Sequence, residues 1–242
     1  MKKYHTPKRI LLKLSGEALQ WDQWYGIDPK FLTFLAKKIV YLVNNEKLEI
    51  VVVVGGGNIF RWIELEAGGF DRSTGDSMGM LGTIINWLAI WEAIEKQWVD
   101  VRVMTAVPTD KVAEPFIRRR ALRHIEKGRV VVCVGGTGNP YFTTDSCAVL
   151  RGLELDCDVV VKATKVDGIY DKDPKKHTDA VRHEELHMHE VLKRDIRVMD
   201  QAAIALAHDE GIPIYVCRIE DIDTLATEQN VGTYVHWDKR DR

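Results

Sequence analysis

Continuous apolar runs rich in β-branched residues are the feature that most constrains the fold of this 242-residue chain. A strand that is apolar at every position is covered on both faces, which is the usual situation in a parallel sheet. Helical patterns separate the runs, and this alternation favours parallel pairing through right-handed crossovers. The sequence therefore predicts an α/β sandwich in a single domain spanning residues 1–242. The runs are Arg9 to Leu14, Ile50 to Val54, Val101 to Thr105, Val130 to Val134, Val159 to Val161 and Ile214 to Cys217.

The helices between these runs carry recognisable start and stop signals. Asp28-Pro29 is a typical N-cap and first-turn pair, and the apolar residues that follow it fall on one helical face. That face consists of Phe31, Leu35, Ile39 and Leu42. Further helices are predicted after Asp76, before Gly128, from about Asp145, and over Met199 to Glu210 before Gly211.

The charge balance leaves no basic field over the molecule. Lys and Arg total 34 against 36 Asp and Glu, so neither nucleic acid nor an anionic membrane is an expected partner. The four cysteines show no CxxC spacing, which favours reduced thiols and a cytoplasmic protein. No run approaches the ~20 apolar residues of a membrane-spanning helix, so we expect a soluble chain.

Glycine-containing loops follow four of the predicted strands. They begin at Ser15-Gly16, Gly55-Gly56-Gly57, Gly135-Gly136 and Lys162. In parallel sheets ligands bind beyond the carboxyl ends of the strands, and glycines there let backbone N–H groups approach an anion. One such loop would indicate only a tight turn, but these four lie close to cationic side chains, namely Lys13, Arg61, Lys162 and Lys165. The pattern predicts a phosphate-binding edge, and without GxxxxGK[ST] or a GxGxxG fingerprint it requires another scaffold than a P-loop or dinucleotide fold.

Five ordered segments resemble the bacterial uridylate kinases of the amino acid kinase family. They are KLSGEAL from Lys13, GGGNIFR from Gly55, Gly75-Asp76 with Met78 to Leu81, GTGNPYFTTD from Gly136, and KATKVDG from Lys162. The similarity extends from about Lys8 to Tyr234. It implies a three-layer α/β/α sandwich with a mainly parallel central sheet and transfer of the ATP γ-phosphoryl group to UMP in pyrimidine nucleotide biosynthesis. It also implies a homohexamer built from dimers, with UMP bound mainly by the N-terminal part and ATP mainly by the C-terminal part.

The resemblance also implies roles for individual residues. Those at the reaction centre would be Lys13, Arg61, Asp145 and Lys162. Those holding ATP would be Lys13, Leu14, Ser15, Gly16, Gly57, Arg61, Thr164, Lys165, Tyr170 and Asp173. Those holding UMP would be Gly56, Asp76, Thr137, Gly138, Asn139, Pro140, Tyr141, Phe142, Thr143 and Thr144. No protein metal site is expected, because Mg²⁺ would arrive with ATP and keep several of its waters.

Simpler interpretations of the same residues stay open at this stage. Asp145 either caps the helix that starts there or pairs with Lys13 to fix its ammonium group, and one carboxylate could do both. Asp76 could likewise be only a helix cap, and Lys162 and Lys165 could be solvated loop charges. Uridylate kinases are allosterically regulated by GTP and UTP, but that property depends on subunit contacts outside the shared motifs, so we do not transfer it.

Three other features have their own interpretations. The histidines His183, His187 and His189 are expected to form a solvated patch, as are the arginines Arg118, Arg119, Arg120 and Arg123. The apolar stripe of Trp87, Trp91, Ile94 and Trp98, widened by Leu81, Ile84, Ile85 and Leu88, predicts a helix that also packs across a two-fold dimer interface. Trp62 stands where this family is expected to have glycine, and the loop from Trp21 to Tyr25 is unusually bulky.

Two alternatives to a UMP kinase are open. Kinases of carbamate, acetylglutamate or aspartate share the fold but should lack Asp76 and the loop from Thr137 to Thr144. A non-catalytic nucleotide or oxyanion binder would keep the glycine loops and lose the cations at the reaction centre. Lys13 and Arg61 therefore favour catalysis.

Overall fold

The computed structural model describes residues 7–21, 23–60, 69, 71–174, 176–194, 196, 198–225 and 231–237. Two residues singled out from the sequence, Arg61 and Trp62, lie outside these ranges.

A nine-stranded sheet in the order β4-β3-β5-β2-β1-β6-β8-β9-β7 forms the centre of the molecule. Every neighbouring pair is parallel except β8 and β9, which are antiparallel. The strands are β1 (Arg9–Leu14), β2 (Glu49–Val54), β3 (Val101–Thr105), β4 (Glu114–Pro115), β5 (Val130–Val134), β6 (Val159–Thr164), β7 (Glu185–His187), β8 (Ile214–Arg218) and β9 (Thr233–His236). The apolar runs thus predicted six of the nine strands and missed the short strands at the two edges.

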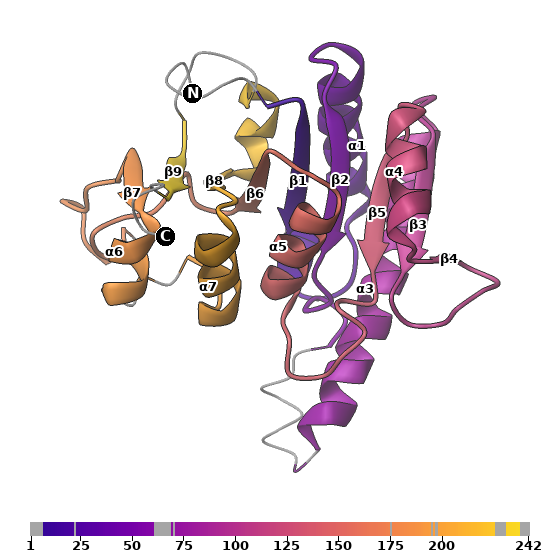
Figure 1. Ribbon diagram of the computed structural model, residues 1–242, viewed down its shortest axis with the longest axis horizontal. Coiled ribbons are helices and arrows are strands. Elements are labelled where there is room, and N and C mark those ends of the chain that lie inside the picture. The colour runs from indigo at the N-terminus through magenta and orange to yellow at the C-terminus, as the bar shows by residue number, and fades with distance from the viewer. Residues whose placement is uncertain are drawn as a thin grey trace.

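Helices cover both faces of this sheet, which confirms the three-layer sandwich (Figure 1). One face carries α1 (Pro29–Asn44), α3 (Arg72–Glu95) and the 3₁₀ turn η2 (Ile219–Thr224). The other carries α4 (Arg118–Glu126), α5 (Thr144–Glu154), α6 (Met188–Lys193) and α7 (Gln201–Glu210). The 3₁₀ turn η1 (Gly16–Gln20) follows β1 and buries Ala18 and Leu19 on the α1 face. Consecutive residues of one strand therefore enter different layers: Leu12 packs against α1, whereas Leu11 packs against the α5 side. This is why the central strands are apolar at every position.

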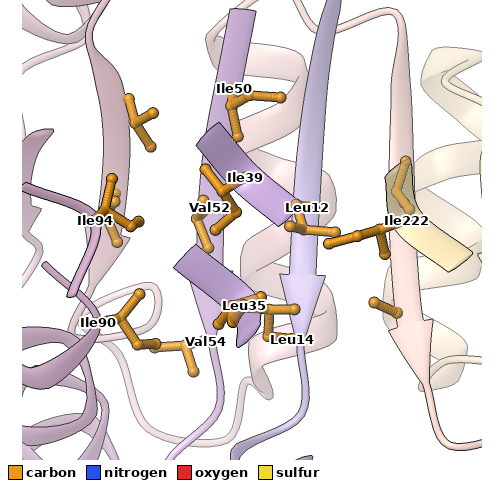
Figure 2. Close-up of a cluster of buried hydrophobic side chains, with 14 of the residues drawn as sticks. Leu12, Leu14, Leu35, Ile39, Ile50, Val52, Val54, Ile90, Ile94 and Ile222 are labelled. Carbon is orange, nitrogen blue, oxygen red and sulfur yellow. The ribbon is translucent and has the colours of Figure 1, made fainter. Parts of the chain in front are cut away.

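The first of these layers is shown in Figure 2, where Leu35 and Ile39 of α1 lie over Leu12, Leu14 and Val52 of the sheet. The predicted apolar face of α1 is confirmed, because Phe31, Leu35, Ile39 and Leu42 are all buried. The predicted cap is confirmed as well: the Asp28 carboxylate accepts a hydrogen bond from the backbone N–H of Lys30 at 2.7 Å.

Helix α3 differs from its prediction at both ends. It begins at Arg72 with Asp71 as its N-cap, so the interpretation of Asp76 as a cap is wrong. At the other end the helix stops at Glu95, and Trp98 lies beyond it with 96% of its surface exposed, so Trp98 is not part of the apolar stripe. The middle of α3 is long and apolar enough to cross a membrane by length and composition alone, which the sequence had not suggested. It packs Trp87, Ile90 and Ile94 into the core, as the central helix of a globular domain does.

Two other element boundaries differ from their predictions, and both concern residues of the site. Strand β6 continues to Thr164, three residues further than predicted, so Lys162 is a strand residue and not part of a solvated loop. Helix α7 begins at Gln201 and is capped by Asp200, whereas the prediction started it at Met199.

The chain changes direction across the sheet at β1. From β1 it passes to β2 on one side, and the later strands β6 and β8 lie on the other side. In parallel sheets such a reversal leaves a crevice outside the carboxyl ends of the strands, because the crossovers run away from each other there. The carboxyl end of β1 holds Lys13 and Leu14, so the fold places the predicted site at this reversal.

Candidate active site

Two lysines from distant parts of the sequence meet at the reversal point. Lys13 on β1 and Lys162 on β6 are paired in register across neighbouring parallel strands, so their side chains leave the same face of the sheet. Asp145, the second residue of α5, lies over that face. Its carboxylate oxygens are 2.6 Å from the Lys13 Nζ and 2.9 Å from the Lys162 Nζ. The predicted pairing of Asp145 with Lys13 is confirmed, and Lys162 joins it.

The cap of α5 is Thr143 and not Asp145. The Thr143 hydroxyl accepts the backbone N–H of Asp145 at 3.0 Å. The Asp145 carboxylate is thereby left to the two lysines, and the cap interpretation of Asp145 is wrong. Its place in the first turn still favours the ionised form, because the positive end of the helix dipole lies there.

Burial and charge act in opposite directions on this cluster. Burial works to raise the pKa of Asp145, but the positive charges of Lys13 and Lys162 outweigh it and hold that pKa below its ordinary value. Burial lowers the pKa of Lys162, and the nearby charge of Lys13 adds to this, while Asp145 opposes it. With all three groups ionised, the cluster has one positive charge in excess, which suits it to a phosphate group.

A cavity of about 540 Å³ lies between α3 and the loop that leads into α5, and its lining reaches Thr144, the residue before Asp145. Its size lies within the range of small-molecule sites. Six residues predicted to bind UMP line it: Gly56, Asp76, Tyr141, Phe142, Thr143 and Thr144. Gly57, predicted to contact ATP, also lines it. The other members of the predicted loop, Thr137, Gly138, Asn139 and Pro140, do not line this cavity.

Asp76 ties the loop to helix α3 at the mouth of this cavity. Its Oδ2 accepts the backbone N–H of Tyr141 at 2.8 Å and lies 3.7 Å from the Arg72 guanidinium. Arg72 also lies over the Tyr141 ring, 5.1 Å from its centre. Tyr141 has φ of 71°, a conformation that costs energy for a residue with a side chain, so the loop is held in place by these contacts. No sequence pattern pointed to the contacts that Arg72 makes with Asp76 and Tyr141.

Glycine is required where the β1 and β2 loops meet α3. A Cβ on Gly56 would come within 2.4 Å of the Gly79 carbonyl oxygen, and a Cβ on Gly16 within 2.6 Å of the Gly55 carbonyl oxygen. The backbones of the three segments are therefore in direct contact, and no larger residue fits between them. Asn58 and Asn86 reinforce this region through two side-chain hydrogen bonds of 2.6 and 2.7 Å, and Asn86 also donates to the Gly55 carbonyl.

A second cavity, of about 400 Å³, lies between α5, α6 and α7. Asp145 and Lys162 form its charged end, and the side chains of Val191, Leu192, Ile196 and Ile204 give it an apolar wall. Asp200, at the start of α7, also lines it. Apart from Asp145 and Lys162, the residues lining this cavity were not predicted from the sequence. Aspartate is a common N-cap residue, and this was the one signal that could have pointed to Asp200.

Four residues predicted to hold ATP lie in the loop after β6 or at its start, and none lines either cavity. The Thr164 hydroxyl donates to the Val166 carbonyl at 2.7 Å, and Lys165 is exposed. The Tyr170 hydroxyl donates to Asp167 at 2.8 Å, while Asp173 lies 3.9 Å from Lys176. Their contact with ATP stays a prediction. Within the described ranges no three His, Cys, Asp or Glu side chains group as a metal site.

The geometry of the site agrees with comparisons to known proteins. A model described as the amino acid kinase family matches residues 8–218. The chain belongs to the amino acid kinase family. Among its relatives, the uridylate kinase of Xanthomonas oryzae pv. oryzae (strain KACC10331 / KXO85) is 55% identical over 231 residues, which are 94% of this chain and 96% of the relative.

Solved structures of amino acid kinase relatives lead to the same family. The structure of UMP kinase from Bacillus anthracis superposes with a TM-score of 0.92 at 38% identity, covering 96% of this chain and 97% of the other. UMP kinase from Ureaplasma parvum gives a TM-score of 0.89 at 34% identity, covering 95% and 98%. The resemblance drawn from five sequence segments is thereby confirmed over nearly the whole chain.

Proposed function

We propose that this chain is a kinase that transfers the γ-phosphoryl group of ATP to the phosphate of UMP, giving UDP and ADP. The observation that carries the proposal is the Lys13–Asp145–Lys162 cluster. Asp145 and Lys162 line one cavity, and Thr144, the residue before Asp145, lines the other. One cavity is lined by the residues up to Thr144 and the other by residues from Asp145 onward. The relatives named above support the choice of UMP.

The reaction needs alignment and charge neutralisation more than covalent help. An oxygen of the UMP phosphate forms a bond to the γ-phosphorus of ATP, and the bond from that phosphorus to the β–γ bridging oxygen breaks, its electron pair leaving with ADP. The attacking oxygen is already ionised near neutral pH, so no general base is required. Lys13 and Lys162 would neutralise the negative charge that spreads over the transferring group, and Asp145 would keep their ammonium groups in place.

We assign UMP to the 540 Å³ cavity and the ATP phosphates to the side of Lys162. Within the described ranges the recorded contacts of the Asp76 carboxylate are made by Oδ2, so Oδ1 is suited to accept ribose hydroxyls. The Gly56 and Gly57 backbone lines the same cavity and lies beside the carboxyl end of β1. This division agrees with an N-terminal part that binds mainly UMP and a C-terminal part that binds mainly ATP. Mg²⁺ enters as the MgATP complex, and the enzyme acts in the cytoplasm.

The exposed side of α3 supports self-association. Leu81, Ile85 and Leu88 recur at helical spacing, and 48%, 47% and 37% of their respective surfaces are exposed. An apolar stripe of this kind on a core helix suits a two-fold contact with a second copy, and three such dimers would give the homohexamer. A monomer measured by light scattering at micromolar concentration would contradict this assignment.

The function is tested by ADP release from MgATP with one acceptor at a time. UMP, CMP, carbamate, acetylglutamate and aspartate are compared with a blank that contains no acceptor. We expect ADP release with UMP well above the blank and little with the three carboxylate acceptors. If UMP released no more ADP than the blank, the proposed function would be wrong.

A further inference from the structure

Asp200 makes more contacts than a helix cap requires. As the N-cap of α7, its Oδ1 accepts the backbone N–H of Ala203 at 2.8 Å, and this single bond satisfies the cap. The same carboxylate also accepts hydrogen bonds from two hydroxyl groups of a different helix. Ser146 Oγ lies 3.0 Å from Oδ1 and 3.1 Å from Oδ2, and the Thr143 hydroxyl donates to Oδ2.

Both hydroxyls belong to the start of α5, on either side of Asp145. Thr143 caps the helix by accepting the Asp145 N–H, so its hydroxyl accepts from Asp145 and donates to Asp200 at the same time. Ser146 follows Asp145 directly and is 6% exposed. Figure 1 shows α5 and α7 side by side, and Asp200 joins their first turns. The position of the Asp145 carboxylate therefore depends on a residue 55 positions later in the chain.

The segment before Asp200 fixes the second lysine as well. The Lys162 ammonium donates to the Val198 carbonyl at 2.5 Å and to Asp145 Oδ2 at 2.9 Å. The charge of Asp200 also acts on Lys162, raising the pKa of that lysine against the larger effect of burial. The stretch from Val198 to Asp200 thus contacts both the start of α5 and the Lys162 ammonium.

We infer that Asp200 is a positioning residue for phosphoryl transfer, which holds Asp145 in line with the two lysines through Thr143 and Ser146. This inference rests on the proposed function. Thr143 lines the cavity assigned to UMP and Asp200 lines the one beside Lys162, so their hydrogen bond lies at the boundary between the two substrates. A displaced Asp145 would move both ammonium groups, and small misplacements of aligned groups slow transfer steeply.

The decisive variant is Asp200→Asn, because asparagine caps a helix about as well as aspartate. The asparagine keeps one oxygen that can accept the Ala203 N–H. Its uncharged NH2 group replaces the other carboxylate oxygen, which accepted a hydroxyl. We expect kcat at saturating UMP and MgATP to fall by about 10- to 100-fold, while KM for UMP stays within about two-fold and the melting temperature stays close to that of the unmodified chain. If Asp200 served only as a helix cap, the main loss would be in stability instead of kcat, and it would appear in Asp200→Ala, which removes the cap.

Ser146→Ala provides an independent test, since Ser146 lines neither cavity. If Asp200 acts through Ser146, the losses in kcat for Asp200→Asn and Ser146→Ala will not multiply in the double variant. Glu210→Gln, which removes an exposed charge at the far end of α7, is the matched control and should leave kcat unchanged. An Asp200→Asn enzyme with kcat within about two-fold of the unmodified chain would overturn the inference, because a positioning role requires a kcat loss. Absence of UMP-dependent ADP release in the unmodified chain would instead refute the proposed function, and this inference with it.

Discussion

The two cavities near Asp145 differ in the residues that line them. The cavity assigned to UMP has five glycines in its lining, beside aromatic, hydroxyl and charged side chains; the glycines are Gly56, Gly57, Gly75, Gly79 and Gly136. The cavity beside Lys162 is lined by aliphatic side chains and by the charges of Asp145, Lys162 and Asp200. A close contact made by glycine is disrupted by adding atoms, whereas a contact made by an ionised side chain is lost when that side chain is removed.

Under the proposed function, this difference would assign acceptor recognition and phosphoryl transfer to separate parts of the molecule. Shape and hydrogen bonds in the glycine-lined cavity select an acceptor, and that selection should appear mainly in KM. The charged cluster acts on the group in transfer and should appear mainly in kcat, because its charges count most when negative charge spreads in the transition state. The substitutions below test whether the division holds, from the largest expected effect to the smallest.

Replacing Lys13 by alanine should have the largest effect. We expect kcat to fall by about 10²–10³, the scale seen when one electrostatic stabiliser of a transition state is removed. The KM for UMP should change far less. Steady-state kinetics on Lys13→Ala measures both, with Lys37→Ala on the exposed side of α1 as the control for loss of one positive charge. An unchanged kcat would show that Lys13 takes no part in the transfer, and it would contradict the division of binding and chemistry between the two cavities.

Gly56→Ala tests the glycine contacts of the cavity assigned to UMP by adding one methyl group. Its Cβ would lie 2.4 Å from the Gly79 carbonyl oxygen and 3.3 Å from the Thr83 nitrogen, so the β2 loop or α3 must move. We expect a loss of about 1–3 kcal/mol in unfolding free energy, which lowers the melting temperature by about 2–4 °C per kcal/mol in a chain of this size.

The neighbouring glycine supplies the matched control for this stability experiment. A Cβ on Gly57 would meet only the Glu17 Cγ, at 3.9 Å, which is an ordinary contact. Gly57→Ala should therefore melt close to the unmodified chain. Equal melting temperatures for both alanine variants would show that the close approach of Gly56 to Gly79 does not constrain this side of the site.

Asp76→Ala should act on binding of UMP. The variant loses the acceptor for the Tyr141 N–H and the proposed acceptor for the ribose hydroxyls. We expect KM for UMP to rise about 10-fold, matching the ~1.5 kcal/mol of a hydrogen bond to a charged group, with a smaller change in kcat. Asp76→Asn keeps an oxygen for the Tyr141 N–H, so its KM for UMP should lie between those of the unmodified chain and Asp76→Ala. A fall in kcat with KM unchanged would place Asp76 with the reaction centre instead.

The smallest expected effect is on the alkaline limb of the pH profile. Burial lowers the pKa of Lys162, so this lysine loses its positive charge at a lower pH than an ordinary lysine. If that charge serves the transfer, kcat falls as pH rises through the lowered pKa. Lys162→Arg keeps its charge at every accessible pH, so its profile should lack this limb even if kcat is lower throughout. Profiles of kcat from about pH 7 to 10 measure the difference.

Local patterns predicted the elements well and the ends of helices less well. The central strands were found because both faces of each strand are buried, which leaves an apolar run with clear limits. Asp28 was correctly identified as a cap because Pro29 follows it. The start of α3 was wrongly predicted after Asp76, because Asp71, which stands earlier in the chain, is the N-cap. Either aspartate fits the local pattern, and only the packing of α3 against the β2 loop decides between them.

The sequence by itself determined the parallel sheet, the glycine loops at its carboxyl edge and the presence of cations beside them, because each depends on short segments. What the tertiary structure decided is which of those groups meet. Lys13 and Lys162 are 149 positions apart, and they share Asp145 because β1 and β6 pair in one register that places both side chains on one face. Asp200 reaches the same centre through the packing of α7 on α5. Register and helix packing are set by long-range burial, which no local pattern records.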